Sequence, residues 1–172
     1  MNNSLYELQF GLEGSARYHA RRRAFFDLWH KIIMFLVILS GSAAFSGVFG
    51  APQWIGLFVA GLGALDLVIG FSHKSRDHAV LHRRFVELIS ELQVSDESAL
   101  PRLTQKRLSI EQDEPPIYKA LSLACHNEIV ASHGNGDEHA VPIGFWRHVL
   151  MHFCLFSDFN PSSQADLEVA KS

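Results

Sequence analysis

The sequence is poor in cysteine and has no excess of basic residues. Cys125 and Cys154 are the only two cysteines among 172 residues. Two distant cysteines make no disulfide framework, and their spacing is not that of a zinc site. The formal net charge is −3. The charge balance therefore gives no reason to expect a nucleic-acid partner.

Catalytic motifs are also missing. The chain has no Gly-x-Ser-x-Gly element, no phosphate-binding loop and no dinucleotide fingerprint. His78 with His82, and His148 with His152, are one helical turn apart, but neither pair has the adjacent glutamate of a metalloprotease helix. We therefore expect no enzyme activity, no catalytic residue, no metal and no cofactor. Metal bound by His148 and His152 would support the alternative of a membrane-bound enzyme.

No strand pattern and no signal-peptide pattern is present either. The first 31 residues are polar and mixed, without a short basic region followed at once by an apolar one. We therefore expect the first apolar segment to be retained rather than cleaved.

What the sequence does contain is a pair of long apolar segments. Residues 32–50 carry no charge, residues 54–72 carry only Asp66, and Gly50-Ala51-Pro52-Gln53 separates them. Each segment has about 19 residues, or roughly 28 Å of helix, which matches a hydrocarbon core of about 30 Å. The pattern predicts a transmembrane hairpin whose two ends lie on one side. A buried hairpin in a soluble protein is the alternative.

The flanking charges predict the orientation of the hairpin. The connecting turn is uncharged, whereas basic residues precede the first segment and follow the second: Arg21, Arg22, Arg23 and Lys31, then Lys74, Arg76, Arg83 and Arg84. Because positive charge accumulates on the cytoplasmic side, both termini are expected in the cytoplasm.

Outside the hairpin the spacing of apolar residues predicts helices only. We expect an N-terminal helical segment over 1–31, with a break favoured by Gly11 and Gly14, and a second arm that continues unbroken to Leu92. Helices are predicted over 99–112 and 117–131, after cap residues at Ser95–Ser98. The predicted fold is all-α. It consists of a membrane hairpin (32–72), a cytoplasmic helical region (73–156) and a polar, disordered tail (157–172). The helical region includes a loop at 133–144 and an amphipathic segment at 145–156.

Asp66 is the most informative single residue of the hairpin, because it is the only charge in the two apolar segments. A carboxylate at the centre of a spanning helix costs about 2.5–3.5 kcal/mol on insertion scales, and Asp66 lies about two turns from the cytoplasmic end. One interpretation is a ring of carboxylates that lines a pore in an oligomer. The other is a charge that reaches the interface or pairs with a nearby basic residue.

Small residues recur along both arms. Gly56, Gly63 and Gly70 are spaced by seven residues, and Ser42 and Ser46 lie one helical turn apart. Small faces let helices approach closely, either within one hairpin or between subunits. Because one hairpin has few internal surfaces, we expect a homo-oligomer.

Two clusters of charge flank the helical region. Arg21, Arg22 and Arg23 could form ion pairs with the acidic cluster, or they could face anionic lipid. Arg22 shares a helix face with aromatic residues and is expected to turn inward. The acidic residues are Glu111, Asp113 and Glu114.

Three short segments carry a resemblance to a known family. They are Tyr18-His19-Ala20-Arg21-Arg22-Arg23-Ala24-Phe25-Phe26-Asp27-Leu28-Trp29-His30, Ile110-Glu111-Gln112-Asp113-Glu114-Pro115-Pro116-Ile117-Tyr118, and Cys125-His126-Asn127-Glu128. Together with the hairpin, they resemble the SLATT group of bacterial two-span membrane proteins over roughly residues 14–130. That group is associated with nucleotide-sensing and conflict systems, in which its members are proposed to be pore-forming effectors.

The resemblance implies a location and a function. It implies a multi-pass protein of the bacterial inner membrane, acting in antiviral defence as a homo-oligomeric channel. The bilayer would be its partner, and a cytoplasmic protein or a nucleotide its trigger. The alternative function is a non-conducting scaffold, or a phage-type exclusion protein, that binds a partner at the inner membrane.

Overall fold

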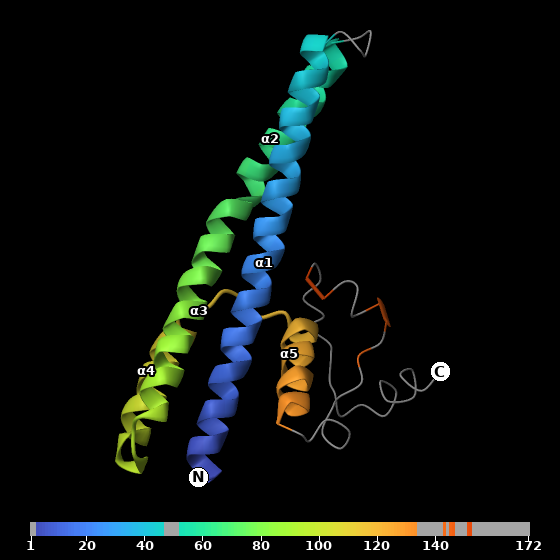
Figure 1. The fold of residues 1–172 in the computed structure, drawn as a ribbon. Coiled ribbons are helices and arrows are strands. Elements are labelled where there is room, and N and C mark those ends of the chain that lie inside the picture. The colour runs from blue at the N-terminus through green and yellow to red at the C-terminus, as the bar shows by residue number, and fades with distance from the viewer. Residues whose placement is uncertain (1–2, 47–51, 134–142, 144, 147–150, 153–172) are drawn as a thin grey trace. The chain divides into compact units, whose positions relative to one another are not determined.

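All the elements in the described part of the chain are helices (Figure 1). The computed structural model describes residues 3–46, 52–133, 143, 145–146 and 151–152, and only the backbone at 3, 43–46 and 52–53. The predicted all-α class is therefore confirmed. The elements are α1 (Asn3–Ser46), α2 (Pro52–Ile69), α3 (Phe71–Gln93), the 3-10 helix η1 (Glu97–Ala99), α4 (Leu100–Glu111) and α5 (Lys119–Ser132).

The chain divides into two compact units. The hairpin unit is Arg21–Ala79, and the helical unit combines Met1–Ala20 with Val80–Ser172. The hairpin unit extends beyond the predicted membrane segment at 32–72. The reason is packing, because Phe26 lies in one apolar cluster with Ile33 and Phe71.

The helical unit packs parts of α1, α3 and α4 around one apolar core. Leu12, Phe85 and Leu103 are fully buried there, one from each helix. Helix α3 contributes an apolar seam of residues at helical spacing, and all of them are buried: Leu81, Phe85, Leu88 and Leu92. The carboxylate of Glu91 on α3 adds ion pairs to Arg102 and Lys106 on α4.

Helix α5 forms a second, smaller cluster with α1. Leu121 and Cys125 pack on Tyr18, and all three are buried. The predicted helix over 117–131 is confirmed with slightly shifted bounds. Ile117 precedes the helix and is exposed, so it does not extend the buried face.

The predicted break near Gly11 and Gly14 is wrong, because α1 runs through both residues. A Cβ atom at Gly11 would lie 2.7 Å from the guanidinium group of Arg107, and one at Gly14 would lie 3.7 Å from Ile129. Gly11 therefore leaves room for the Arg107 side chain, whereas a side-chain carbon at Gly14 would make only an ordinary contact with Ile129. This tertiary packing outweighs the low helix propensity of glycine.

The predicted unbroken second arm is also wrong, because α2 ends at Ile69 and α3 begins at Phe71. Gly70 between them has a φ of +67°, in the left-handed region that favours glycine. Two hydrogen bonds bridge the interruption, from Gly70 N–H to the Asp66 carbonyl at 2.8 Å and from Lys74 N–H to the Gly70 carbonyl at 2.9 Å.

The predicted cap residues at Ser95–Ser98 lie before α4 and overlap the start of η1. Asp96 is the N-cap of η1 and Ala99 that of α4, and neither side chain makes a cap hydrogen bond. The Asp96 carboxylate instead accepts a hydrogen bond from the Ser98 hydroxyl. Helix α4 ends at Glu111, shortly before Pro115 and Pro116, as predicted.

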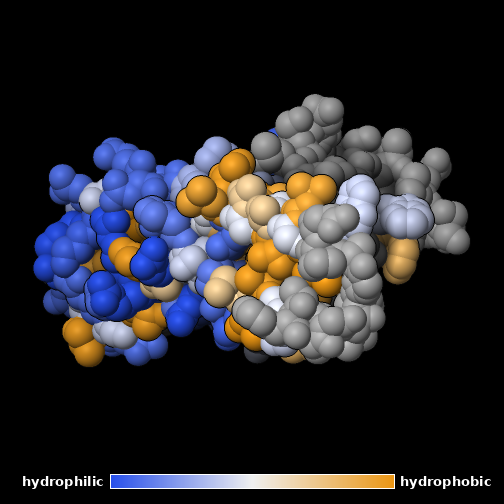
Figure 2. Space-filling model, turned by 90° about the horizontal axis from the view of Figure 1, so that it is seen from above, coloured by the Kyte–Doolittle hydropathy of each residue, from blue (hydrophilic) through white to orange (hydrophobic). Residues whose placement is uncertain are grey.

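The apolar stretches of the hairpin unit are exposed. Two helical stretches, Ser4–Ser42 and Trp54–Gln93, each contain a window long and apolar enough to cross a membrane, and only 11% and 6% of the two windows is buried. A core helix of a soluble protein would be mostly buried. Figure 2 shows hydrophobic side chains, in orange, gathered on the molecular surface.

Several predictions fall outside the described residues. Most of the loop at 133–144, most of the segment at 145–156 and all of the tail at 157–172 lie there, as do His148 and Cys154.

Candidate functional site

Asp66 lies next to a histidine of the other arm. The Nδ1–H group of His30 on α1 donates a hydrogen bond to Oδ1 of Asp66 on α2 at 3.1 Å. The side chains are 31% and 23% exposed, so the pair is partly shielded from its surroundings. This contact corresponds to the interpretation in which Asp66 pairs with a nearby basic group. A role of Asp66 in lining a pore stays a prediction.

The His30–Asp66 pair also shows how the two arms align. Residue 66 lies within the predicted second span, whereas residue 30 precedes the predicted first span. Asp66 therefore lies level with the polar entrance of the first arm, where Asp27 and Lys31 form an ion pair at 2.7 Å. Asp66 thus pairs with a residue that lies just before the apolar segment of the first arm.

The glycines of the predicted stripe differ in their surroundings. A Cβ atom at Gly56 or Gly63 would meet nothing within 4 Å, whereas Gly70 has the positive φ that interrupts the arm. Gly56 and Gly63 therefore do not mediate packing within their own hairpin. The face that they form is available to a neighbour or to lipid.

The serines of the first arm are small but locally bonded. The hydroxyl of Ser42 donates to the carbonyl of Ile38 at 3.0 Å, a common way to satisfy a hydroxyl in an apolar helix. The side chain of Ser46 lies outside the described set.

The three arginines before the hairpin have different environments. Arg22 is only 4% exposed, and its guanidinium group lies over the ring of Phe26 at 4.4 Å from the centroid. The expected inward turn of Arg22 is confirmed. Arg21 is half-buried and Arg23 is exposed. Cation–π contact stabilises a shielded cation.

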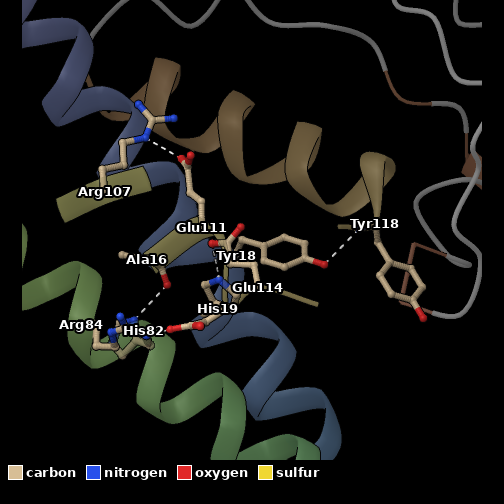
Figure 3. Close-up of polar contacts among 10 residues, drawn as sticks. Ala16, Tyr18, His19, His82, Arg84, Arg107, Glu111, Glu114 and Tyr118 are labelled. Carbon is tan, nitrogen blue, oxygen red and sulfur yellow. Dashed lines mark hydrogen bonds and ion pairs between the residues drawn. The ribbon is translucent and has the colours of Figure 1, made fainter. Parts of the chain in front are cut away.

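A polar cluster in the helical unit joins α1 to the segment after α4. The Nε2–H group of His19 donates to Oε1 of Glu114 at 2.9 Å, and the two side chains are 0% and 7% exposed. The imidazole of His19 stacks on Phe85 with ring centroids 5.6 Å apart. Figure 3 shows His19 and Glu114 pointing toward each other.

Further contacts of the same cluster reach α3 and α5. The backbone N–H of Tyr118, before α5, donates to the Tyr18 hydroxyl at 3.0 Å. Nδ1–H of His82 on α3 donates to the carbonyl of Ala16 at 2.9 Å, and the guanidinium group of Arg84 pairs with Asp113 (Figure 3). The cluster therefore ties the connection between α4 and α5 to α1 and α3.

The predicted acidic cluster is thus distributed among separate partners. Glu111 accepts from Arg107 at 2.6 Å, while Asp113 pairs with Arg84 and Glu114 with His19. Pairing of these carboxylates with Arg21, Arg22 and Arg23 stays a prediction.

The described residues offer no metal site. They contain no group of three or more His, Cys, Asp or Glu side chains placed to hold a metal ion. His78 stacks on Phe26 at 5.6 Å between centroids, and His82 bonds to a backbone carbonyl. Cys125 is buried.

Sequence reasoning missed His30 and His19. Counting residues from the predicted turn at 50–53 does not find His30, because His30 lies 20 residues before that turn and Asp66 lies 13 residues after it. His19 lies in the first segment that carries the resemblance, and Glu114 lies in the second. Their contact brings together the first and second of the segments that carry the resemblance, although these are far apart in the sequence.

Comparisons with protein-family models, with curated proteins and with solved structures find no match for this chain.

Proposed function

We propose that this chain is an integral protein of the bacterial inner membrane and that, as a homo-oligomer, it is a pore-forming or membrane-perturbing effector. The observation that carries this proposal is the outward apolar surface of the hairpin unit. Its two apolar windows are only 11% and 6% buried.

The size of that surface favours a bilayer over water. Burial of one large apolar side chain is worth about 1.5–3 kcal/mol. Even with partial exposure, a dozen such side chains would gain on the order of 10 kcal/mol on entering hydrocarbon, which is comparable to the whole stability of a domain. They are Leu28, Ile32, Met34, Phe35, Ile38, Leu39, Trp54, Leu57, Phe58, Leu65, Leu67 and Val68.

The open glycine face supports oligomer formation. Close approach of helices in lipid depends on small residues, and nothing within the chain occupies the space beside Gly56 and Gly63. One hairpin cannot enclose a pore, so a conducting form requires several copies around an axis.

The cytoplasmic helices are the proposed control element. The flanking cations and the uncharged turn favour cytoplasmic termini. The resemblance to the SLATT group favours a cytoplasmic protein or nucleotide as the trigger and antiviral defence as the setting. The His19–Glu114 cluster gives the helical unit a defined structure on which a trigger could act.

Ion flux from liposomes that contain the purified chain tests the proposal. We expect flux with the wild type, and a loss of at least about tenfold with Gly63→Ile, because a bulky side chain separates the helices. Gly61→Ile is the matched control, since Gly61 is equally open but lies on another side of α2. Liposomes that stay tight with the wild type under every trigger would contradict a pore.

A non-conducting scaffold is the second candidate, and the His30–Asp66 contact favours it. A carboxylate that pairs within its own hairpin is less available to line a pore. The scaffold predicts a stable complex with a cytoplasmic partner in membranes that remain impermeable. Asp66→Asn should then leave permeability unchanged, whereas a pore lined by Asp66 would change its conductance or selectivity.

A further inference from the structure

Three cations of the hairpin unit form no ion pair with a carboxylate in the part of the chain that the structure describes. They are Arg23, Lys74 and Arg76, and all three are exposed. The hairpin unit contains only three acidic residues, and each is already paired: Asp27 with Lys31, Asp66 with His30, and Asp77 with His73. Positive charge therefore remains uncompensated within this unit.

The three cations lie at one level on two helices. The hydroxyl of Ser75 on α3 donates to the carbonyl of Arg23 on α1 at 3.4 Å, so residues 74–76 lie beside Arg23. The ammonium group of Lys74 lies 5.8 Å from the centroid of Phe26, also on α1. We call Arg23, Lys74 and Arg76 the cationic band.

The cationic band lies just beyond the outward apolar surface. Leu28 on α1 and Val68 on α2 are the large exposed apolar residues nearest to it within the unit. Arg23 is about 7.5 Å and Lys74 about 9 Å farther along the helices. The polar layer on each side of a bilayer is about 5–8 Å thick. If the apolar surface fills the hydrocarbon, the cationic side chains reach the headgroups.

We infer that the cationic band binds anionic phospholipid headgroups of the bilayer. The inference rests on the proposed membrane insertion and adds a preference for one lipid class. Arg23 and Arg76 can each donate two parallel hydrogen bonds to a phosphate, and Lys74 contributes a compact charge. Arg22 does not belong to the band, because its guanidinium group is buried over Phe26.

Quenching of Trp29 by brominated lipid tests the inference. Trp29 lies in the hairpin unit close to the band, and Trp54→Phe with Trp146→Phe leaves it as the only tryptophan. The full chain is placed in bilayers with either brominated phosphatidylglycerol or brominated phosphatidylcholine in an unlabelled background. Since one basic residue near the surface is worth about a fivefold preference, we expect phosphatidylglycerol to bind at least about fivefold more tightly.

Substitutions distinguish the effect of the cationic band on lipid preference from the effect of net charge alone. Lys74→Gln should reduce the preference several-fold, and the triple variant with Arg23→Gln and Arg76→Gln should remove it. Lys31→Gln is the matched control, because it removes the same charge from a residue already paired with Asp27. If Lys31→Gln reduces the preference for phosphatidylglycerol as much as Lys74→Gln does, the assignment to the cationic band is overturned.

The other possible quenching results distinguish failure of the lipid preference from failure of membrane insertion. Equal quenching by both lipids overturns the inference and leaves membrane insertion intact. Absence of quenching by either lipid overturns insertion itself, and the proposed function with it. A preference that persists unchanged in high salt would also contradict the band, because exposed charges are screened.

Discussion

At the scale of single residues, two histidines define the polar contacts of this chain. His19 is fully buried and bonds to Glu114, and His30 is partly buried and bonds to Asp66. A buried polar group that loses its partner costs about 1–3 kcal/mol. Neither histidine stands out in the sequence, where ten histidines are spread among mixed residues. Their importance follows from pairing across 95 and 36 residues, respectively.

The pairing of His30 with Asp66 predicts energetic coupling between the two arms. His30→Ala and Asp66→Ala should each destabilise the hairpin, while the double variant should cost less than the sum. We expect a coupling of about 0.5–1.5 kcal/mol, the range for polar contacts between membrane helices. Unfolding in mixed micelles measures it. Additive effects would mean that the contact contributes nothing, and Ser42→Ala with Asp66→Ala gives the additive control.

At the scale of elements, the interruption at Gly70 shapes the second arm. Helix propensity and apolar pattern give no sign of it, because the residues on both sides favour a helix. The positive φ of one glycine ends α2 and starts α3, while hydrogen bonds on either side persist. Gly56 and Gly63 look the same in sequence but lie in ordinary helix.

Gly70→Ala is therefore expected to act differently from Gly63→Ala. A Cβ atom in the left-handed region costs roughly 1–2 kcal/mol, so Gly70→Ala should destabilise the hairpin or straighten the arm. Gly63→Ala should be neutral or stabilising, because alanine favours a helix by about 1 kcal/mol and no atom obstructs it. Unfolding in micelles compares the two. Equal behaviour of both variants would argue against an interruption at Gly70.

Most elements could be predicted from sequence, whereas their junctions could not. The α3 seam, α4 and α5 follow from apolar spacing and from the prolines after α4. The continuity of α1 does not, because it depends on Arg107 and Ile129 lying close to Gly11 and Gly14. The candidate residues Asp66 and Arg22 stood out as unusual charges. The partner of Asp66 is His30 of the other arm, so tertiary structure alone identifies it, whereas Phe26 lies one helical turn from Arg22 on the same helix.

At the scale of the whole molecule, the two units differ in how much apolar surface they expose. Most of the exposed large apolar residues lie in the hairpin unit, and the helical unit has its own core around Phe85 and Leu103. The exposed apolar windows of the hairpin unit are what its proposed insertion into lipid predicts.

That difference and the flanking charges predict which parts of the chain face which side. In a background with Cys125→Ser and Cys154→Ser, Gln53→Cys in the turn should react with a membrane-impermeant thiol reagent on intact spheroplasts. Ser98→Cys, before α4, should react only after the membrane is opened, because the cations that flank both arms hold that end in the cytoplasm. Reaction of both cysteines in intact spheroplasts would contradict a spanning hairpin, and the opposite pattern would reverse its orientation. Retained liposome binding by both variants ensures that the chain is still inserted when the labelling is compared.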